Sequence, residues 1–128
     1  MIRVGNKNRG VVRFSNCAFW GPCRQIALAE GLGTVGFSDC TFVQWGFKDK
    51  DEGKPNEKER IETSAIQVLS GNLILRGCEF QDKMPQIFLG ENVKRAIVTG
   101  NLIHGEERIE NKAGEKPNIV IRDNVSGN

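Results

Sequence analysis

The residues best suited to chemistry in this 128-residue chain are four cysteines and one histidine, Cys17, Cys23, Cys40, Cys78 and His104. Thiolates act as nucleophiles, as redox partners and as metal ligands. No two of these cysteines have the C-x-x-C spacing of a zinc site or a thioredoxin-like redox pair. A single histidine adds few ligands, so the sequence predicts no metal site.

Placing Cys17, Cys40 and Cys78 on top of one another shows that these cysteines mark an internal repeat. The segments "VVRFSNCAF", "TVGFSDCTF" and "LILRGCEF" superimpose, and "AIVTGNLI" and "IVIRDNVS" follow with Asn101 and Asn124 in the cysteine's place. The five positions, here called the key positions, are separated by 23, 38, 23 and 23 residues. The longer interval contains the most polar stretch of the chain, which indicates one repeat with an insertion at residues 46–64.

Each copy alternates apolar and polar residues, which is typical of half-buried strands. Apolar residues recur five and three residues before the key position and two residues after it, with Ser126 as the exception. A further strand is expected about nine residues later, where four isoleucines align and an apolar residue follows two places on. The aligned residues are Ile26, Ile66, Ile87 and Ile109, followed by Leu28, Val68 and Leu89, and turn glycines precede three copies at Gly10, Gly33 and Gly71.

Repeats of this length with three short strands and glycine-bearing turns predict an all-β fold, a right-handed single-stranded parallel β-helix. Like residues then stack at the inter-strand spacing of about 4.8 Å. A leucine-rich repeat would need a regular L-x-x-L-x-L pattern and a helix or equivalent arc, and the chain has neither. One domain of about five coils is expected, near residues 10–32, 33–70, 71–92, 93–115 and 116–128.

Three segments resemble the C-terminal coils of bacterial pectate-lyase-superfamily proteins, which include relatives of polygalacturonase-type glycoside hydrolases. They are "GVVRFSNCAFWGPCRQIALAEGLGTVGFSDCTFVQW", "LILRGCEFQDKMPQIFLGENVKRAIVTGN" and "IVIRDN". The resemblance covers roughly residues 10–125. It implies a secreted or periplasmic polysaccharide-active protein with substrate along one sheet, although this chain has no secretory signal and lacks the family's opening motif.

Outward positions of the strand that begins each second half-coil are the candidate binding surface. Amides, an arginine and an aromatic ring suit sugar hydroxyls and the apolar face of a sugar ring. Trp45 is either a stacking platform or packing beneath the insertion. Two outward rows are expected, Gln25, Ala65, Gln86 and Arg108, then Ala27, Gln67, Phe88 and Glu110. The predicted substrate-binding residues are Gln25, Gln67, Gln86, Phe88, Arg60 of the charged insertion and Trp45.

Arg108 and Glu110 are the candidate catalytic residues because they are the ionisable members of these rows. The resemblance implies that a lyase would use a basic residue, often with calcium-binding carboxylates. A hydrolase needs two opposed carboxylates roughly 5–10 Å apart. Neither a carboxylate pair nor a calcium cluster is evident, so no cofactor is predicted except calcium in the lyase alternative.

The sequence therefore predicts a carbohydrate-associated module that binds polysaccharide without complete catalytic machinery. The alternatives are an active lyase or hydrolase on an acidic polysaccharide, and a structural β-helix that oligomerises. Nucleic acid is not expected as a partner, because 18 basic and 16 acidic residues are mixed along the chain. No apolar run is long enough for a membrane span. Unpaired end strands predict a homo-oligomer or upstream coils. Cys17, Cys40 and Cys78 are expected to be free, buried thiols, whereas the pairing of Cys23 is left open.

Overall fold

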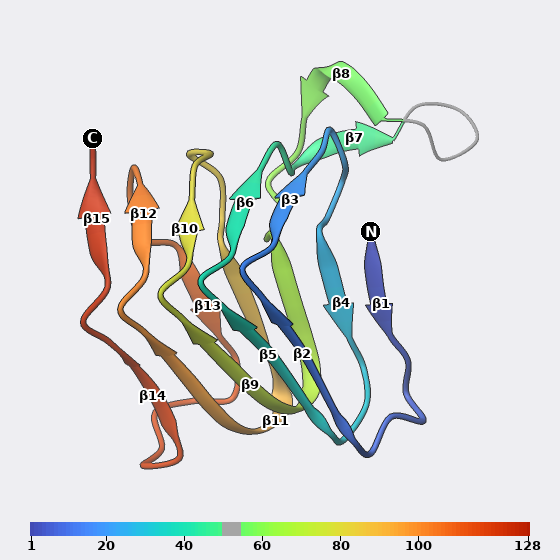
Figure 1. The fold of residues 1–128 in the computed structure, drawn as a ribbon, viewed down its shortest axis with the longest axis vertical. Helices are drawn as coiled ribbons and strands as arrows, with labels where there is room; N and C mark the ends of the chain where they lie inside the picture. Colours follow the sequence, from blue (N-terminus) through green and yellow to red (C-terminus); the bar gives the residue numbers. More distant parts are fainter. Residues whose placement is uncertain (50–54) are drawn as a thin grey trace.

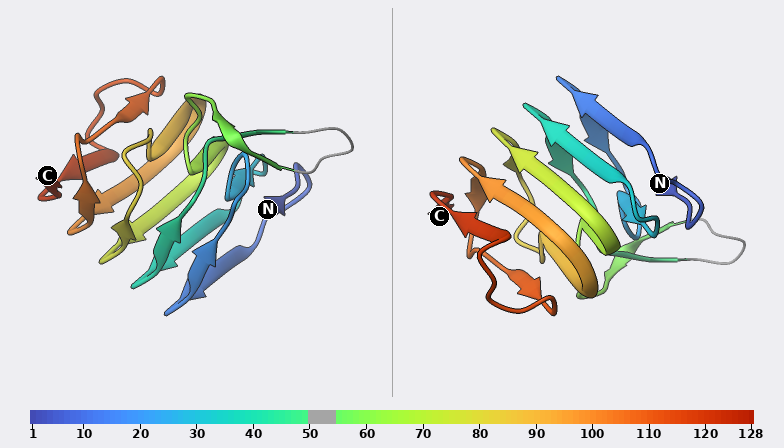
Figure 2. Two further views of the ribbon diagram at one scale, coloured as in Figure 1. Left: turned by 90° about the horizontal axis from the view of Figure 1, so that it is seen from above. Right: turned by 90° about the horizontal axis from the view of Figure 1, so that it is seen from below.

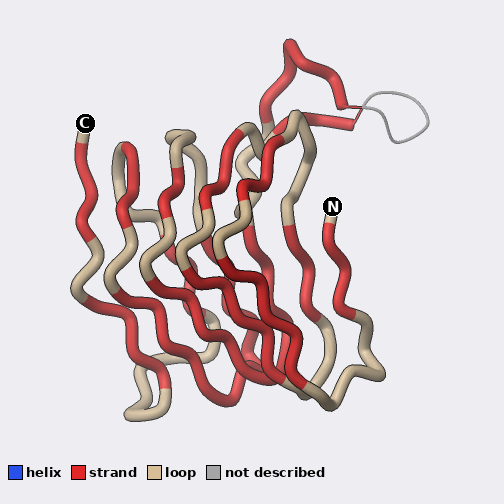
Figure 3. Tube along the Cα trace, in the orientation of Figure 1, coloured by secondary structure: helices blue, strands red, loops and turns tan. Residues whose placement is uncertain are grey.

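The computed structural model, which describes residues 1–49 and 55–128, is a right-handed parallel β-helix of about five turns (Figure 1). The described residues contain no helix. Strands on the same face of neighbouring coils lie side by side, with bends between the faces (Figure 3). The predicted fold class is confirmed.

Each coil contributes to three faces. The first face contains β1 (Ile2–Val4), β4 (Ala27–Ala29), the first parts of β9 (Ile66–Arg76) and β11 (Ile87–Thr99), and β13 (Ile109–Asn111). The second face contains β2 (Val11–Ser15), β5 (Thr34–Ser38), the later parts of β9 and β11, and β14 (Ile119–Arg122). The third face contains β3 (Ala18–Trp20), β6 (Thr41–Val43), β10 (Glu79–Phe80), β12 (Leu102–His104) and β15 (Val125–Gly127).

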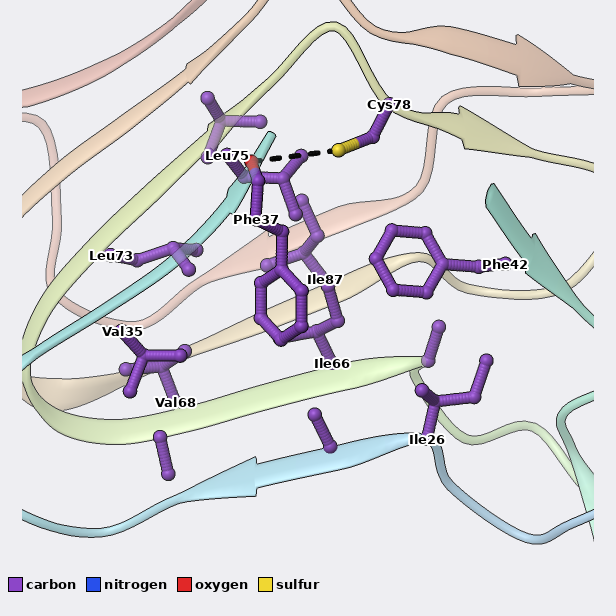
Figure 4. Close-up of a cluster of buried hydrophobic side chains, with 14 of the residues drawn as sticks. Ile26, Val35, Phe37, Phe42, Ile66, Val68, Leu73, Leu75, Cys78 and Ile87 are labelled. Carbon is purple, nitrogen blue, oxygen red and sulfur yellow. Dashed lines mark hydrogen bonds between the residues drawn. The ribbon is translucent and has the colours of Figure 1, made fainter. Parts of the chain in front are cut away.

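The register confirms the repeat columns on the second and third faces. Phe37 pairs with Phe14 on one side and with Leu75 on the other. Leu75 is in turn the partner of Val98, which pairs with Ile121. Since strand side chains alternate between faces, this register turns the whole column into the core. The buried cluster around Phe37, Leu75 and the key position Cys78 is shown in Figure 4.

A left-handed residue before every key position makes the bend between the second and third faces. Its φ lies between 54° and 66° in all five coils. Asparagine, aspartate and glycine are the types that adopt this conformation most readily, and the chain uses only these. The five residues are Asn16, Asp39, Gly77, Gly100 and Asp123.

Glycine at the bend between the first and second faces is required by close backbone packing. Gly71 has φ of +78°, and a Cβ atom there would lie 2.4 Å from the carbonyl oxygen of Gly33. A Cβ on Gly33 would in turn lie 2.2 Å from the carbonyl oxygen of Gly10. The predicted glycine column is therefore a stack of backbone contacts with no room for a side chain.

The predicted alignment of Ile26 with Ile66 on the first face is wrong by one residue. Ile66 pairs with Ala27, and Val68 pairs with Ala29, not with Leu28. The amides of Ile26 and Ala27 both donate to the carbonyl oxygen of Ala65, so an extra residue enters before the ladder begins. The other two isoleucines of this column, Ile87 and Ile109, do pair as predicted.

The insertion, expected as a charged loop, contains an antiparallel hairpin. It is formed by β7 (Phe47–Asp49) and β8 (Pro55–Arg60), and residues 50–54 of the predicted loop lie outside the described residues. The hairpin extends away from the β-helix (Figure 2). Phe47 is buried, and the Arg60 guanidinium lies 4.1 Å from its ring centroid.

Candidate functional site

The outward row of the first face is Arg3, Leu28, Gln67, Phe88 and Glu110, one from each coil. Gln67, Phe88 and Glu110 share this row as predicted, whereas Ala27 is buried and Leu28 takes its place. Phe88 and Gln67 are partly exposed neighbours on adjacent rungs. The apolar ring of Phe88 therefore lies beside the side-chain amide of Gln67 on the outer surface of the first face.

Gln86 and Gln25 were predicted to point outward, and both are buried. Gln86 is fully covered; its Nε2 donates to the carbonyl oxygens of Met84 (2.8 Å) and Glu106 (3.2 Å), and its Oε1 accepts from the Arg108 amide (2.6 Å). Its side chain satisfies backbone groups at the approach to the strand, where alternation no longer holds. Gln25 is 8 % exposed and donates to the Gln67 Oε1 atom at 3.1 Å. Gln86 is therefore a structural residue, and Gln25 orients the Gln67 amide.

A shallow hollow of about 330 Å³ adjoins this row at the last coils. Glu110, the register partner of Phe88, lines it together with Arg108. The Arg108 guanidinium pairs with Glu62 at the end of the insertion, which brings the insertion to the hollow's edge. The remaining lining residues are Ser64, Pro85 and Ile109.

The two predicted catalytic residues are both engaged in exposed ion pairs. Arg108 pairs with Glu62, and Glu110 accepts from the Lys112 Nζ atom at 3.2 Å. Glu110 thus faces a cation and not a second carboxylate. In the residues that the structure describes, no group of three or more His, Cys, Asp and Glu side chains could hold a metal ion. Among the described residues that line this hollow, Glu110 is the one carboxylate, so they do not form the carboxylate pair of a general acid and base mechanism.

Arg60 and Trp45, both predicted as ligand contacts, anchor the hairpin. The Arg60 Nη2 atom donates to the Trp45 carbonyl oxygen (2.7 Å) and pairs with Asp82 (2.7 Å). Trp45 is fully buried, packs edge-on against Phe80 and donates from Nε1 to the Pro85 carbonyl oxygen at 2.8 Å. Of the alternatives for Trp45, packing beneath the insertion is correct, and no indole face is left for a sugar.

From Cys40 onward, the side chain at each key position forms a hydrogen bond to a backbone carbonyl oxygen of the preceding coil. Cys78 Sγ lies 3.5 Å from the Phe37 carbonyl oxygen (Figure 4), and Asn101 Nδ2 donates to the equivalent oxygen of Leu75 at 3.3 Å. A thiol and an amide therefore reach the same acceptor one coil back, which explains how asparagine can replace cysteine in the last two coils. The Asn101 Oδ1 atom also accepts a hydrogen bond from the Cys78 backbone amide at 2.9 Å, and a thiol sulfur is a weaker acceptor for such a bond.

All four cysteines are free, as predicted for Cys17, Cys40 and Cys78. Cys40 and Cys78 are buried, whereas Cys17 and Cys23 are only partly buried because they lie in the first coil. Burial raises the pKa of the Cys78 thiol to about 11, and it raises the pKa of Cys40 and Cys23 as well. These thiols remain protonated at neutral pH, which does not suit nucleophilic chemistry.

His104 contacts Glu79 at 2.8 Å on the third face, apart from the hollow. No helix in the described part of the chain is long and apolar enough to cross a membrane. Comparisons with protein-family models, with curated proteins and with solved structures give no match. The geometry of the chain itself is therefore the basis for a functional proposal.

Proposed function

We propose that this chain is a glycan-binding β-helix module that acts without catalytic machinery of its own. One observation carries the proposal: Phe88 and Gln67 lie on adjacent outward rungs beside the hollow lined by Arg108 and Glu110. A partly exposed ring offers an apolar platform, while the amide and the charged groups offer hydrogen bonds to hydroxyls. Gln25 holds the Gln67 amide in place from below.

The resemblance of the repeat to the pectate-lyase superfamily supports a polysaccharide as the ligand. We infer that the chain is related to those proteins, and that it functions where they do, outside the cytoplasm. A ladder with rungs about 4.8 Å apart presents one outward side chain per coil at regular intervals along the β-helix. A polymer of sugars, which also repeats, fits such a surface better than a single small molecule does.

Replacing Phe88 by alanine is expected to weaken polysaccharide binding about tenfold, equivalent to ~1.4 kcal/mol, because the ring platform is lost. Leu102→Ala is the matched control, since Leu102 is an exposed apolar residue on the third face. Isothermal titration calorimetry against polygalacturonate, alginate and a neutral glucan measures the effect. Loss of affinity in Phe88→Ala alone supports the proposal. Equal affinity in both variants, or no binding to any of the three polymers, overturns it.

The same three polymers test the enzymatic alternative. Unsaturated products that absorb in the ultraviolet would identify a lyase, and new reducing ends without that absorbance would identify a hydrolase. Because Arg108 and Glu110 are both engaged in ion pairs, we expect neither unsaturated products nor new reducing ends. Either product, formed by the purified chain and lost in Glu110→Gln, would replace the non-catalytic proposal.

A second candidate function is assembly through the first coil. Within the described residues, β1, β2 and β3 pair on one side only, with β4, β5 and β6. Their core side chains Phe14 and Phe19 are partly exposed, Trp20 is 71 % exposed, and a hollow of about 320 Å³ lies beside it. We propose that further coils cover this end, supplied by a second copy or by an upstream segment.

Light scattering coupled to size exclusion, applied to the 128-residue chain, tests assembly through a second copy. The expected result is a concentration-dependent oligomer that Trp20→Ala weakens. Val125→Ala is the control. It removes an exposed apolar side chain from the last coil, and it therefore shows which end of the β-helix forms the contact. A monomer at all concentrations would exclude the second copy.

A further inference from the structure

The second face carries arginines and no carboxylates at its outward positions. These positions form three rows that run along the β-helix. None of the row residues is an aspartate or glutamate. Asp39 and Asp123 lie at the adjoining bends, where Asp123 pairs with Arg122 at 3.6 Å. The rows are Val11, Thr34, Asn72 and Arg95; Arg13, Gly36, Ile74, Ile97 and Val120; and Ser15, Ser38, Arg76, Thr99 and Arg122.

Three of the four arginines on this face have no partner among the described residues. In the part of the chain that the structure describes, the guanidinium groups of Arg13, Arg76 and Arg95 make no hydrogen bond or ion pair, and all three residues are exposed. Arginines elsewhere are engaged: Arg3 pairs with Glu30, for example. Unneutralised cations gathered on one flat face attract anions and concentrate the local field.

Between the basic residues lies an apolar strip flanked by hydroxyl groups. The strip consists of Ile74, Ile97 and Val120, and Ile97 is 45 % exposed. Ser38 and Thr99 lie in the neighbouring row. Apolar carbons beside hydroxyls suit the mixed surface of a sugar ring. No aromatic residue occupies the three rows, so the base-stacking platforms typical of single-stranded nucleic-acid sites are missing from these described strands.

A hollow at the corner of the same face extends the basic surface. Its volume is about 440 Å³, and three cations line it against one carboxylate, Glu91. Arg95 belongs both to the hollow and to the first of the three rows. The hollow therefore continues the face toward the last coil. The cations are Lys94, Arg95 and Lys116, and Asn92 and Asn118 add amide groups.

We propose that the second face binds an anionic polysaccharide through Arg13, Arg76 and Arg95, with its carboxylate or sulfate groups on the guanidiniums and its ring carbons on the Ile74–Ile97 strip. This rests on the proposed glycan-binding function and adds to it a second surface and the charge of the ligand. Arginine binds planar carboxylates and sulfates through paired N–H donors. The polymer spans several coils, because the three arginines belong to the first, third and fourth.

The test compares two triple variants that remove the same charge. Arg13→Gln, Arg76→Gln and Arg95→Gln together are expected to weaken binding roughly 10- to 100-fold, the range for three exposed charge contacts. The control removes the lysines Lys7, Lys48 and Lys83, which lie outside the second face, and should bind nearly as wild type does. Titrations use polygalacturonate, dextran sulfate and neutral dextran at several salt concentrations, and circular dichroism confirms folding.

Selective loss in the arginine variant, with a shallower salt dependence, supports the proposal, and comparison of the two anionic polymers assigns carboxylate or sulfate. Equal weakening of binding in both triple variants would mean that net charge alone explains the effect, and it would overturn the second-face proposal. Duplex DNA binding as tightly as either polysaccharide would also overturn it. If the arginine variant binds normally while Phe88→Ala does not, the second-face proposal fails and the glycan-binding function remains.

Discussion

Replacing Phe37 by alanine is expected to lower the free energy of unfolding by about 3–5 kcal/mol, the range for deleting a buried aromatic side chain. Phe37 is fully buried at the centre of an aromatic cluster. Its ring stacks on that of Phe14 with centroids 5.2 Å apart, and it meets the rings of Phe19 and Phe42 edge-on at 5.9 and 5.5 Å. The variant removes all three ring contacts and leaves a cavity between neighbouring coils.

Phe14→Ala is the matched control because it deletes the same side chain one coil earlier, where the core is partly exposed. Solvent can enter there, so the expected cost is smaller, about 1–2 kcal/mol. Urea denaturation followed by circular dichroism measures both free energies. Equal losses at the two positions would contradict a core that is closed at Phe37 and open at Phe14.

Asn101→Leu is expected to cost about 2–4 kcal/mol, because two buried backbone groups lose this side-chain partner at once. Asn101 is 2 % exposed, accepts the Cys78 amide and donates to the Leu75 carbonyl oxygen and to Asn124 Oδ1. Leucine has a similar size but no polar atoms. The backbone amide of Cys78 and the carbonyl of Leu75 would remain buried without this side-chain partner.

Asn101→Cys is the informative comparison, since cysteine fills this position in the first three coils. Its thiol can reach the Leu75 carbonyl oxygen as Cys78 reaches that of Phe37, at 3.5 Å, so the expected cost is only about 1–2 kcal/mol. Thermal and urea unfolding of both variants give the order. A leucine variant as stable as the cysteine variant would contradict a polar ladder at the key positions.

The repeat columns could be predicted because a strand with one buried face alternates apolar and polar residues along the sequence. Phe14, Phe37 and Leu75 occupy one column in the structure for that reason. The same alternation correctly predicted outward side chains for Gln67 and Phe88, each the second residue of its strand. Where a strand has not yet begun, the rule fails, and Gln86 folds back onto backbone carbonyls.

Contacts between distant segments were not predictable from local pattern. The pairing of Arg108 with Glu62 joins residues 46 positions apart, and the Trp45–Pro85 bond joins residues 40 apart. Both depend on the path of the hairpin, which the mixed charges of the insertion do not encode. The left-handed bend could have been predicted from the sequence, because a turn-forming residue type precedes every key position, as at Asn16, Asp39 and Asp123.

Chemical-shift mapping tests the central claim, polysaccharide binding on the sheet faces, most directly. Amide resonances of the 14.2 kDa chain are followed by nuclear magnetic resonance while polygalacturonate oligomers are added. The account predicts shifts at residues 66–68, 87–89 and 109–111 of the first face and along the arginine rows of the second. Shifts confined to the third face or to the ends of the β-helix, or an unchanged spectrum at saturating oligomer, would contradict it.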